Sequence, residues 1–215
     1  YPKMRTKEPT QYRKTLRSKI VRCAAELFMR HGVRDVKMDD IAHHLSISKR
    51  TLYEIYCNKE DLLLEVVRHH VEETHKYYAQ LIESASNVMD ILIGITRHRM
   101  KVLNEVSPDF IRDLANYPSV AEMSDRMSDQ RHEESIRIIK RGIDEGYFLP
   151  NVNYELMGRI EEALIQDRVN YRHDASELRD YFYIYILIFI RSICTEAGLK
   201  ILDPFLEEIK EAQKA

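Results

Sequence analysis

The sequence lacks the features that mark disulfide-rich, zinc-binding and membrane-spanning proteins. Its three cysteines, Cys23, Cys57 and Cys194, lie far apart without Cys-x-x-Cys spacing, so we expect them to be buried thiols. No apolar run approaches the roughly 18 to 20 residues that a transmembrane helix needs. The first ten residues, YPKMRTKEPT, contain no apolar segment like that of a secretory signal. We therefore expect a cytoplasmic protein with no membrane partner.

Glycine and proline are also scarce. There are six of each among 215 residues, and they cluster at a few points instead of forming a linker. Hydrophobic residues make up 44% of the chain, which is enough to build a core. Few helix breakers together with this apolar content indicate long helices, and we predict an all-α fold.

Charge is distributed unevenly along the chain, although the net charge is only −2. Residues 1–61 hold 14 lysines and arginines against 8 aspartates and glutamates, and the remainder is acidic. This asymmetry indicates an N-terminal end that faces a polyanion and a body that repels the same polyanion.

Three helices are predicted near the N-terminus, and the last two of them are short. Residues 15–32 and 38–45 carry apolar side chains at helical spacing, and the second of these segments begins with acidic residues in its first turn. Residues 46–56 offer Ser48 as the N-cap of a third helix. This arrangement is typical of a helix-turn-helix. Residues 1–14 have almost nothing to bury and predict a mobile basic arm.

Longer helices are predicted over the rest of the chain. Apolar stripes and the positions of proline and glycine place them at residues 60–84, 88–104, 109–117, 119–145, 153–171, 176–195 and 201–213. We therefore expect a basic arm (1–14), a helix-turn-helix DNA-binding domain (15–62) and a larger all-helical domain (63–215).

The run YFYIYILIFI, residues 181–190, has no charge at all. We predict a helix here, and a helix that is apolar all round must be covered on every side. A homodimer interface through Tyr181, Tyr185, Ile186 and Phe189 would cover it. A central core helix within one protomer is the alternative.

The third N-terminal helix carries the features that point to function. In a helix-turn-helix the second helix of the pair enters the major groove with its N-terminal residues toward the bases. Here that helix begins with Lys49, Arg50 and Thr51, which can bond bases or phosphates. Helical geometry of 100° per residue turns Tyr56 inward and places Tyr53 on the flank, where its hydroxyl can reach a phosphate.

Residues 20–67, IVRCAAELFMRHGVRDVKMDDIAHHLSISKRTLYEIYCNKEDLLLEVV, resemble the DNA-binding domain of the tetracycline-repressor (TetR) family of bacterial transcriptional regulators. The likeness rests on the alanine pair before Leu27 and Phe28, on Gly32 eight positions after Ala24, on the DIA triplet and on TLYEIYCNKEDLL. The phrases EGYF and TEAG in the C-terminal half agree with the resemblance.

The resemblance implies DNA contacts by Lys49, Arg50, Thr51 and Tyr53, and a phosphate contact by Lys59. The sequence departs from the family at two positions. Lys37 stands where a capping threonine or serine often contacts phosphate, although a lysine can still reach the DNA backbone. Ser46 replaces the usual turn glycine and would need a strained backbone or a shifted turn.

The resemblance further implies a ligand-responsive regulator that binds a palindromic double-stranded operator as a homodimer. Because most members of the family repress transcription, we expect a repressor. A small molecule that fits only one conformation would release the DNA. The resemblance makes residues 63–215 the ligand-binding and dimerisation domain, in which we expect helices 153–171 and 176–195 to form the dimer. Adaptable apolar side chains that could line the ligand pocket are Met89, Met100, Met123, Met127 and Met157. Core packing is the alternative role for each of these methionines. No catalytic residue, metal or cofactor is expected.

Two other classes compete with this interpretation. The Glu-x-x-His pair Glu72 and His75 suits a helical-bundle di-metal carboxylate enzyme, but such sites need the motif twice. The nearest second copies, at residues 129–132 and 40–43, are incomplete. A helical scaffold that had lost DNA binding would have little reason to keep Lys49, Arg50 and Lys59.

Overall fold

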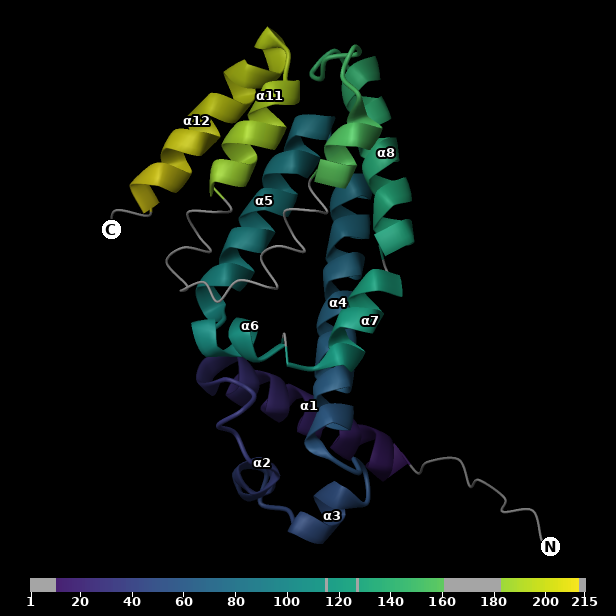
Figure 1. The fold of residues 1–215 in the computed structure, drawn as a ribbon, viewed down its shortest axis with the longest axis vertical. Coiled ribbons are helices and arrows are strands. Elements are labelled where there is room, and N and C mark those ends of the chain that lie inside the picture. The colour runs from purple at the N-terminus through teal and green to yellow at the C-terminus, as the bar shows by residue number, and fades with distance from the viewer. Residues whose placement is uncertain (1–10, 115, 127, 161–182, 213–215) are drawn as a thin grey trace, which may run out of the picture.

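The computed structural model describes residues 11–114, 116–126, 128–160 and 183–212, which are almost entirely helical (Figure 1). The elements are α1 (Gln11–His31), α2 (Met38–His44), α3 (Lys49–Tyr53), α4 (Lys59–Ser84), α5 (Val88–Glu105), α6 (Pro108–Leu114), α7 (Pro118–Arg126), α8 (Ser128–Asp144), the π-helix η1 (Ile186–Ile190), α11 (Arg191–Ile193) and α12 (Glu196–Ala212). Residues 154–160 are helical as well. Among the helices described, none is long and apolar enough to cross a membrane.

The molecule is elongated, with α1, α2 and α3 at one end and α11 and α12 at the other (Figure 1). Helix α4 starts beside α1 and runs up into the part of the molecule that α5 to α12 form, called the body below. There α4 lies near α5 and α8 (Figure 1). Its 26 residues give it a length of about 39 Å, at 1.5 Å of rise per residue. The long helix predicted from residue 60 is therefore confirmed, and it joins the two ends of the molecule.

The first hydrophobic core lies between α1 and the start of α4. Ile20, Ala24 and Phe28 of α1 and Leu62 and Leu63 of α4 are completely buried there. Two body residues, Phe110 of α6 and Val120 of α7, belong to the same core. The helix-turn-helix end is thus packed directly onto helices that the sequence assigned to the regulatory domain.

The second core fills the body, and the phrases EGYF and TEAG meet at its edge. Gly146, in EGYF, has a φ of 79° and follows α8. Thr195 donates from its hydroxyl to the Gly146 carbonyl at 2.7 Å and from its backbone N–H to the Tyr147 carbonyl at 2.8 Å. A Cβ on Gly198 would lie only 2.6 Å from the Tyr147 carbonyl oxygen. The two phrases therefore form one tertiary contact.

Several predicted boundaries are corrected by the structure. Helix α1 begins at Gln11, so residues 11–14 belong to a helix and not to the arm; residues 1–10 lie outside the described residues. Helix α12 begins at Glu196, five residues before the predicted start, because Thr195 accepts the Gly198 N–H and caps it. Of the three cysteines, Cys23 and Cys194 are buried as expected, whereas Cys57 is exposed.

The apolar run at residues 181–190 is helical from residue 183, and residues 181 and 182 lie outside the described residues. Ile186 and Phe189 are only 1% and 7% exposed, because they pack in the body's own core. Ile184 and Ile188 are instead 51% and 58% exposed. Ile186 and Phe189, predicted at an intersubunit surface, thus pack within their own protomer, as the alternative of a core helix expects, and the outward face of this helix carries the other two isoleucines.

Ser46 adopts the strained conformation that its position demands. Its φ is 53°, in the left-handed region that a side chain disfavours, and its N–H donates to the His43 carbonyl at 3.0 Å. The turn between α2 and α3 is therefore not shifted; the chain accepts the strain that a glycine would avoid.

Replacing Ser46 with glycine should stabilise the protein. Glycine relieves the left-handed strain in the folded protein, but it also has more conformational freedom in the unfolded chain. The net increase in the free energy of unfolding should be about 0.5–1 kcal/mol. Chemical denaturation followed by circular dichroism measures this difference. Ser48→Gly is the comparison in the same segment: Ser48 has a φ of −69°, so no strain is relieved, and loss of the N-cap hydroxyl should lower stability slightly. Equal midpoints for Ser46→Gly and the unaltered protein would contradict the strain.

Candidate nucleic-acid interface

The start of α3 is fixed by Ser48, the predicted N-cap. Its Oγ accepts the Thr51 backbone N–H at 3.0 Å, and the two hydroxyls lie 2.7 Å apart. An N-cap serine satisfies one of the backbone donors that a helix start leaves unpaired. A five-residue helix has few internal hydrogen bonds, so this cap largely decides where Lys49, Arg50 and Thr51 point.

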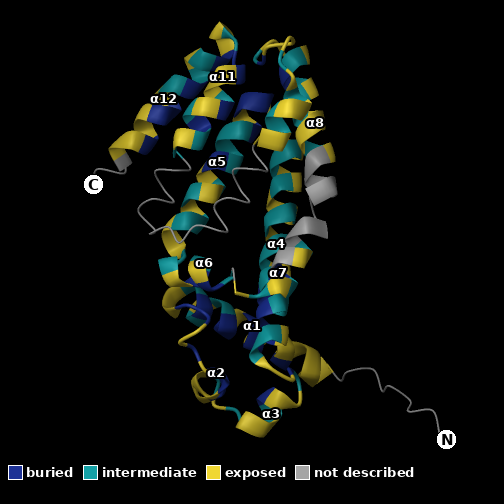
Figure 2. Cartoon of the chain, in the orientation of Figure 1, coloured by how far each residue is buried: buried dark blue, intermediate teal, exposed yellow. Residues whose placement is uncertain are grey.

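Helix α3 lies at the tip of the molecule and is coloured largely as exposed (Figure 2). The side chains of Lys49 and Arg50 are 61% and 88% exposed. Lys49 pairs with Asp39 of α2, and Arg50 pairs with Glu54, each at 2.9 Å. The hydrogen bond and charge of Asp39 raise the pKa of Lys49, so this ammonium stays charged. Because water screens exposed ion pairs and leaves them weak, a phosphate or a base can displace either acid at little cost.

The two tyrosines of this segment lie on different faces, as predicted. Tyr56 is 3% exposed and packs in the first core beside Leu52, with the Arg17 guanidinium 5.3 Å from its ring centroid. Tyr53 is 41% exposed, and the Lys49 ammonium lies 6.0 Å from its ring. Tyr56 thus anchors α3, and Tyr53 stands on the same exposed surface as the basic residues.

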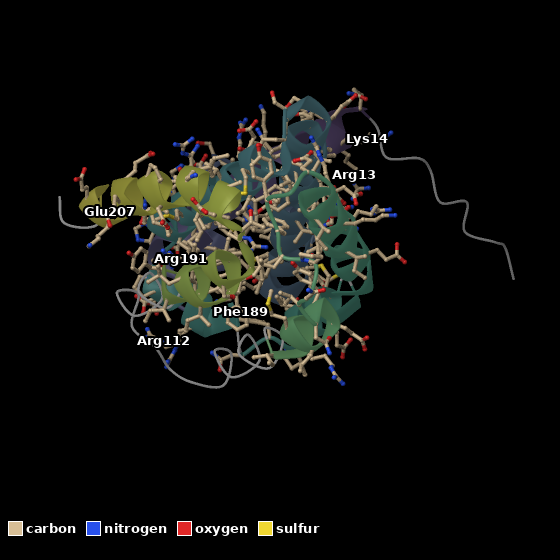
Figure 3. The ribbon with its side chains drawn as sticks, turned by 90° about the horizontal axis from the view of Figure 1, so that it is seen from above. Arg13, Lys14, Arg112, Phe189, Arg191 and Glu207 are labelled. Atoms are coloured by element: carbon tan, nitrogen blue, oxygen red, sulfur yellow. The ribbon has the colours of Figure 1, made fainter. Side chains whose placement is uncertain are left out.

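Arg13 is part of this end of the molecule, a placement that the sequence did not predict. Its guanidinium donates to the Glu54 carbonyl, at the C-terminal end of α3, at 3.2 Å. Arg13 and Lys14 lie together at the start of α1 (Figure 3). The sequence placed both in a mobile arm because no apolar neighbour indicated that α1 begins at Gln11.

Lys37 and Lys59 have different surroundings. Lys37 is the N-cap of α2, where its backbone N–H donates to the Asp40 carboxylate at 2.8 Å, and its side chain is exposed. The ammonium of Lys59 instead donates to the carbonyls of Val33, Arg34 and Val36, at 2.8, 3.2 and 3.1 Å. Since an ammonium has three protons, these bonds use all its donors. Lys59 therefore holds the turn between α1 and α2.

The methionines expected in a ligand pocket do not share one cavity among the described residues. Met89 is fully buried in the body core, and Met157 is packed at its edge. Met100 lines a hollow of about 360 Å³ between α5 and α12, and Met123 lines another of about 380 Å³ between α4 and α7. Met127 lies outside the described residues. For Met89, core packing is the role that the structure supports.

The residues expected at a dimer interface are divided as well. Tyr185 is half-buried and stacks on Phe189 with ring centroids 5.2 Å apart, inside the body. Tyr181 lies outside the described residues, as do residues 161–171 and 176–182 of the two nominated helices. The exposed apolar side chains of the described parts of these helices are Leu156, Ile160, Ile184 and Ile188.

Comparisons with known proteins agree with this arrangement. Residues 20–66 match the sequence model of the family described as "Bacterial regulatory proteins, tetR family". The chain is similar to the HTH-type transcriptional repressor KstR2 of Mycobacterium tuberculosis, with 27% identity over 151 residues, 66% of this chain and 74% of the repressor.

Solved structures show the same fold. A TetR-family transcriptional regulator from Marinobacter aquaeolei superposes with a TM-score of 0.68 at 21% identity, covering 90% of this chain and 98% of the other. A putative transcriptional regulator from Saccharomonospora viridis, solved in complex with choline, gives a TM-score of 0.60 at 19% identity over 85% of this chain and 100% of the other. This likeness extends the match from the helix-turn-helix to the body.

The capped and exposed α3, the family match that spans it and the shared fold of the body lead to one conclusion. The TetR family comprises transcriptional regulators and not enzymes. Residues 20–66 are therefore a TetR-type helix-turn-helix, and the described part of the chain has the fold of solved TetR-family transcriptional regulators.

Proposed function

We propose that the chain is a ligand-responsive repressor that binds a palindromic operator as a homodimer and leaves it when a small molecule binds the body. The observation that carries this proposal is the exposed basic start of α3, capped by Ser48 at the tip of the molecule. The relative KstR2 is a transcriptional repressor, which supports repression over activation.

The proposed contacts follow from position on α3. Arg50, the most exposed of the basic side chains, reads a base edge, because an arginine fork matches the two acceptors of guanine. Lys49 and Thr51 bond bases or phosphates beside it, and Tyr53 bonds a phosphate from the flank. Lys37, exposed at the start of α2, reaches the DNA backbone.

Exposed apolar side chains on the two helices nominated for the dimer support the homodimer. Ile184 and Ile188 are four residues apart, and so are Leu156 and Ile160, so each pair shares one face of its helix. All four side chains are between 44% and 58% exposed in one protomer. A two-fold contact between such faces would remove them from water and set the distance between the two copies of α3, about 34–36 Å for successive major grooves.

The body offers polar chemistry for an effector between α4 and α5. The imidazole of His98 stacks on Tyr77 with ring centroids 4.5 Å apart, and its edge contacts Tyr78 at 5.5 Å. Its Nε2 is buried with no hydrogen-bond partner among the described residues. Burial lowers the pKa of His98, so the neutral ring can bond a ligand atom there. A ligand that fits only one spacing of α4 and α5 would shift the protein toward it.

Selection of genomic fragments tests the proposal directly. The full chain is mixed with sheared DNA of the source organism, and bound fragments are recovered and sequenced. A two-fold symmetric motif supports the proposal, and a set of fragments without a common motif contradicts it. Small molecules that release the selected duplex then identify the effector class.

Arg50→Ala should weaken binding to the selected duplex by about 1–3 kcal/mol and relax the preference at particular base pairs. Tyr53→Phe should instead cost about 0.5–1.5 kcal/mol on selected and unrelated duplexes alike, because a phosphate contact carries no sequence information. Fluorescence anisotropy at fixed salt measures both. Equal, sequence-blind losses for the two variants would show that α3 meets DNA in another register.

Ile188→Glu should convert the dimer to a monomer, because the interface would then bury an unpaired charge. Light scattering during size-exclusion chromatography measures the mass. Ile136→Glu is the matched control: Ile136, on α8, is 51% exposed against 58% for Ile188, and its substitution should leave the dimer intact. An unchanged dimer for Ile188→Glu would place the interface elsewhere, and a monomeric unaltered protein would refute the homodimer.

A further inference from the structure

The turn between α1 and α2, residues 32–37, is held from two sides by helices that lead into the body. From α4, the Lys59 ammonium donates to three carbonyls of this turn. From α6, the Asp113 carboxylate accepts the Arg34 backbone N–H at 2.7 Å. Both contacts join segments that are far apart in sequence, and neither follows from the helix-turn-helix pattern.

Asp113 is unusual because a carboxylate is rarely buried. It is 7% exposed, one of two buried polar or charged residues among those described. Removing a carboxylate from water is costly unless hydrogen bonds compensate. The bond to the Arg34 N–H provides such compensation in a geometry that only this turn supplies, so α6 and the turn must keep their relative position.

Close packing reinforces this contact. Gly32, which ends α1, has a φ of 81°, and a Cβ there would lie 3.0 Å from both the Asp109 Cβ and the Asp113 Oδ2. The Ser107 N–H donates to the Met29 carbonyl at 2.7 Å, and Phe110 is buried in the core of the helix-turn-helix end. Helix α6 is therefore fitted against the end of α1 with no space for slippage.

The turn leads directly to the DNA-binding surface. It ends at Lys37, the N-cap of α2, and α2 packs against α3 and pairs with it through Asp39 and Lys49. A shift of α6 relative to α4 must consequently either break the grip on the turn or carry α2 and α3 with it.

We propose that Asp113 and Lys59 are positioning residues that couple the body to the DNA-binding end by gripping this turn, and that Lys59 serves this role in place of a phosphate contact. The proposal rests on DNA binding through α3, as put forward above. It deepens that function by naming the residues through which the body and the DNA affect each other. Because coupling is reciprocal, DNA bound at α3 must restrain α6 through the same contacts.

Hydrogen–deuterium exchange of the full chain, with and without the selected genomic duplex, tests the coupling. In the unaltered protein, saturating DNA should slow exchange in residues 37–53 and also in residues 104–114, which comprise the end of α5, the linker and α6. The slowing in residues 104–114 should be about fivefold or more, the lower end of typical couplings. Asp113→Leu should keep the slowing in residues 37–53 and lose it in residues 104–114. Asp113→Asn, whose amide oxygen can still accept the Arg34 N–H, should retain most of it.

Asp109→Asn is the matched control, since Asp109 lies one turn earlier on α6 and pairs with the exposed Arg112. It should exchange like the unaltered protein. A role in stability alone would lower the melting temperature of Asp113→Leu but leave DNA-induced slowing in α6 intact. That result, or no slowing of α6 in the unaltered protein, overturns the proposal. No slowing in residues 37–53 would instead refute DNA binding through α3.

Lys59→Met removes the hydrogen bonds from α4 to the turn, and it tests the proposal even if Asp113→Leu does not fold. It should lose the slowing of α6 and bind the selected duplex more weakly, with an unchanged dependence of affinity on salt. A phosphate contact would reduce the slope of log affinity against log salt by about 0.9. Such a reduced slope overturns the assignment of Lys59. Lys76→Met, which removes an exposed lysine in the middle of α4, is its control.

Discussion

The packing of α1 against the first turns of α4 is the interaction on which the rest of the structure depends. Helices α2 and α3 have seven and five residues, far fewer than a helix needs to be stable alone in water. They keep their shape because Ile41 and Leu52 are buried against the core that α1 and α4 build. Removing that support would leave α3 capped but unanchored.

This core also explains why the two parts of the chain are not independent. Phe110 and Val120, from α6 and α7, complete it, so the body supplies part of the surface that the helix-turn-helix packs against. Polar contacts at its edge are few and specific, as the Asp113 carboxylate and the Lys59 ammonium illustrate. A protein built in this way can pass a change in the body to its DNA-binding end because the two share packed side chains and not a flexible linker.

The helix-turn-helix could be predicted from sequence in some detail, because its determinants are local. The spacing of apolar residues, the N-cap Ser48 and the inward position of Tyr56 depend only on neighbours within one or two helical turns. Even the strain at Ser46 could be anticipated from the missing glycine. The surroundings of Lys59 could not, since its three acceptors lie 23 to 26 residues away and a lysine at a helix start is equally suited to phosphate.

The apolar helix of residues 183–193 shows the same division in the body. Its place inside a helical segment indicated a helix. Its composition indicated that the helix would be mostly covered, because hydrophobic side chains are removed from water wherever the fold allows. Composition did not determine which side faces inward. Tertiary packing placed Ile186 and Phe189 in the core and left Ile184 and Ile188 outside, because every side of this helix is equally apolar and only its neighbours can choose among them. The sequence by itself determined the helices and the DNA-binding motif, because periodicity and capping are local. The tertiary structure decided the roles of Lys59, Asp113 and the isoleucines, because these roles depend on partners that are distant in sequence.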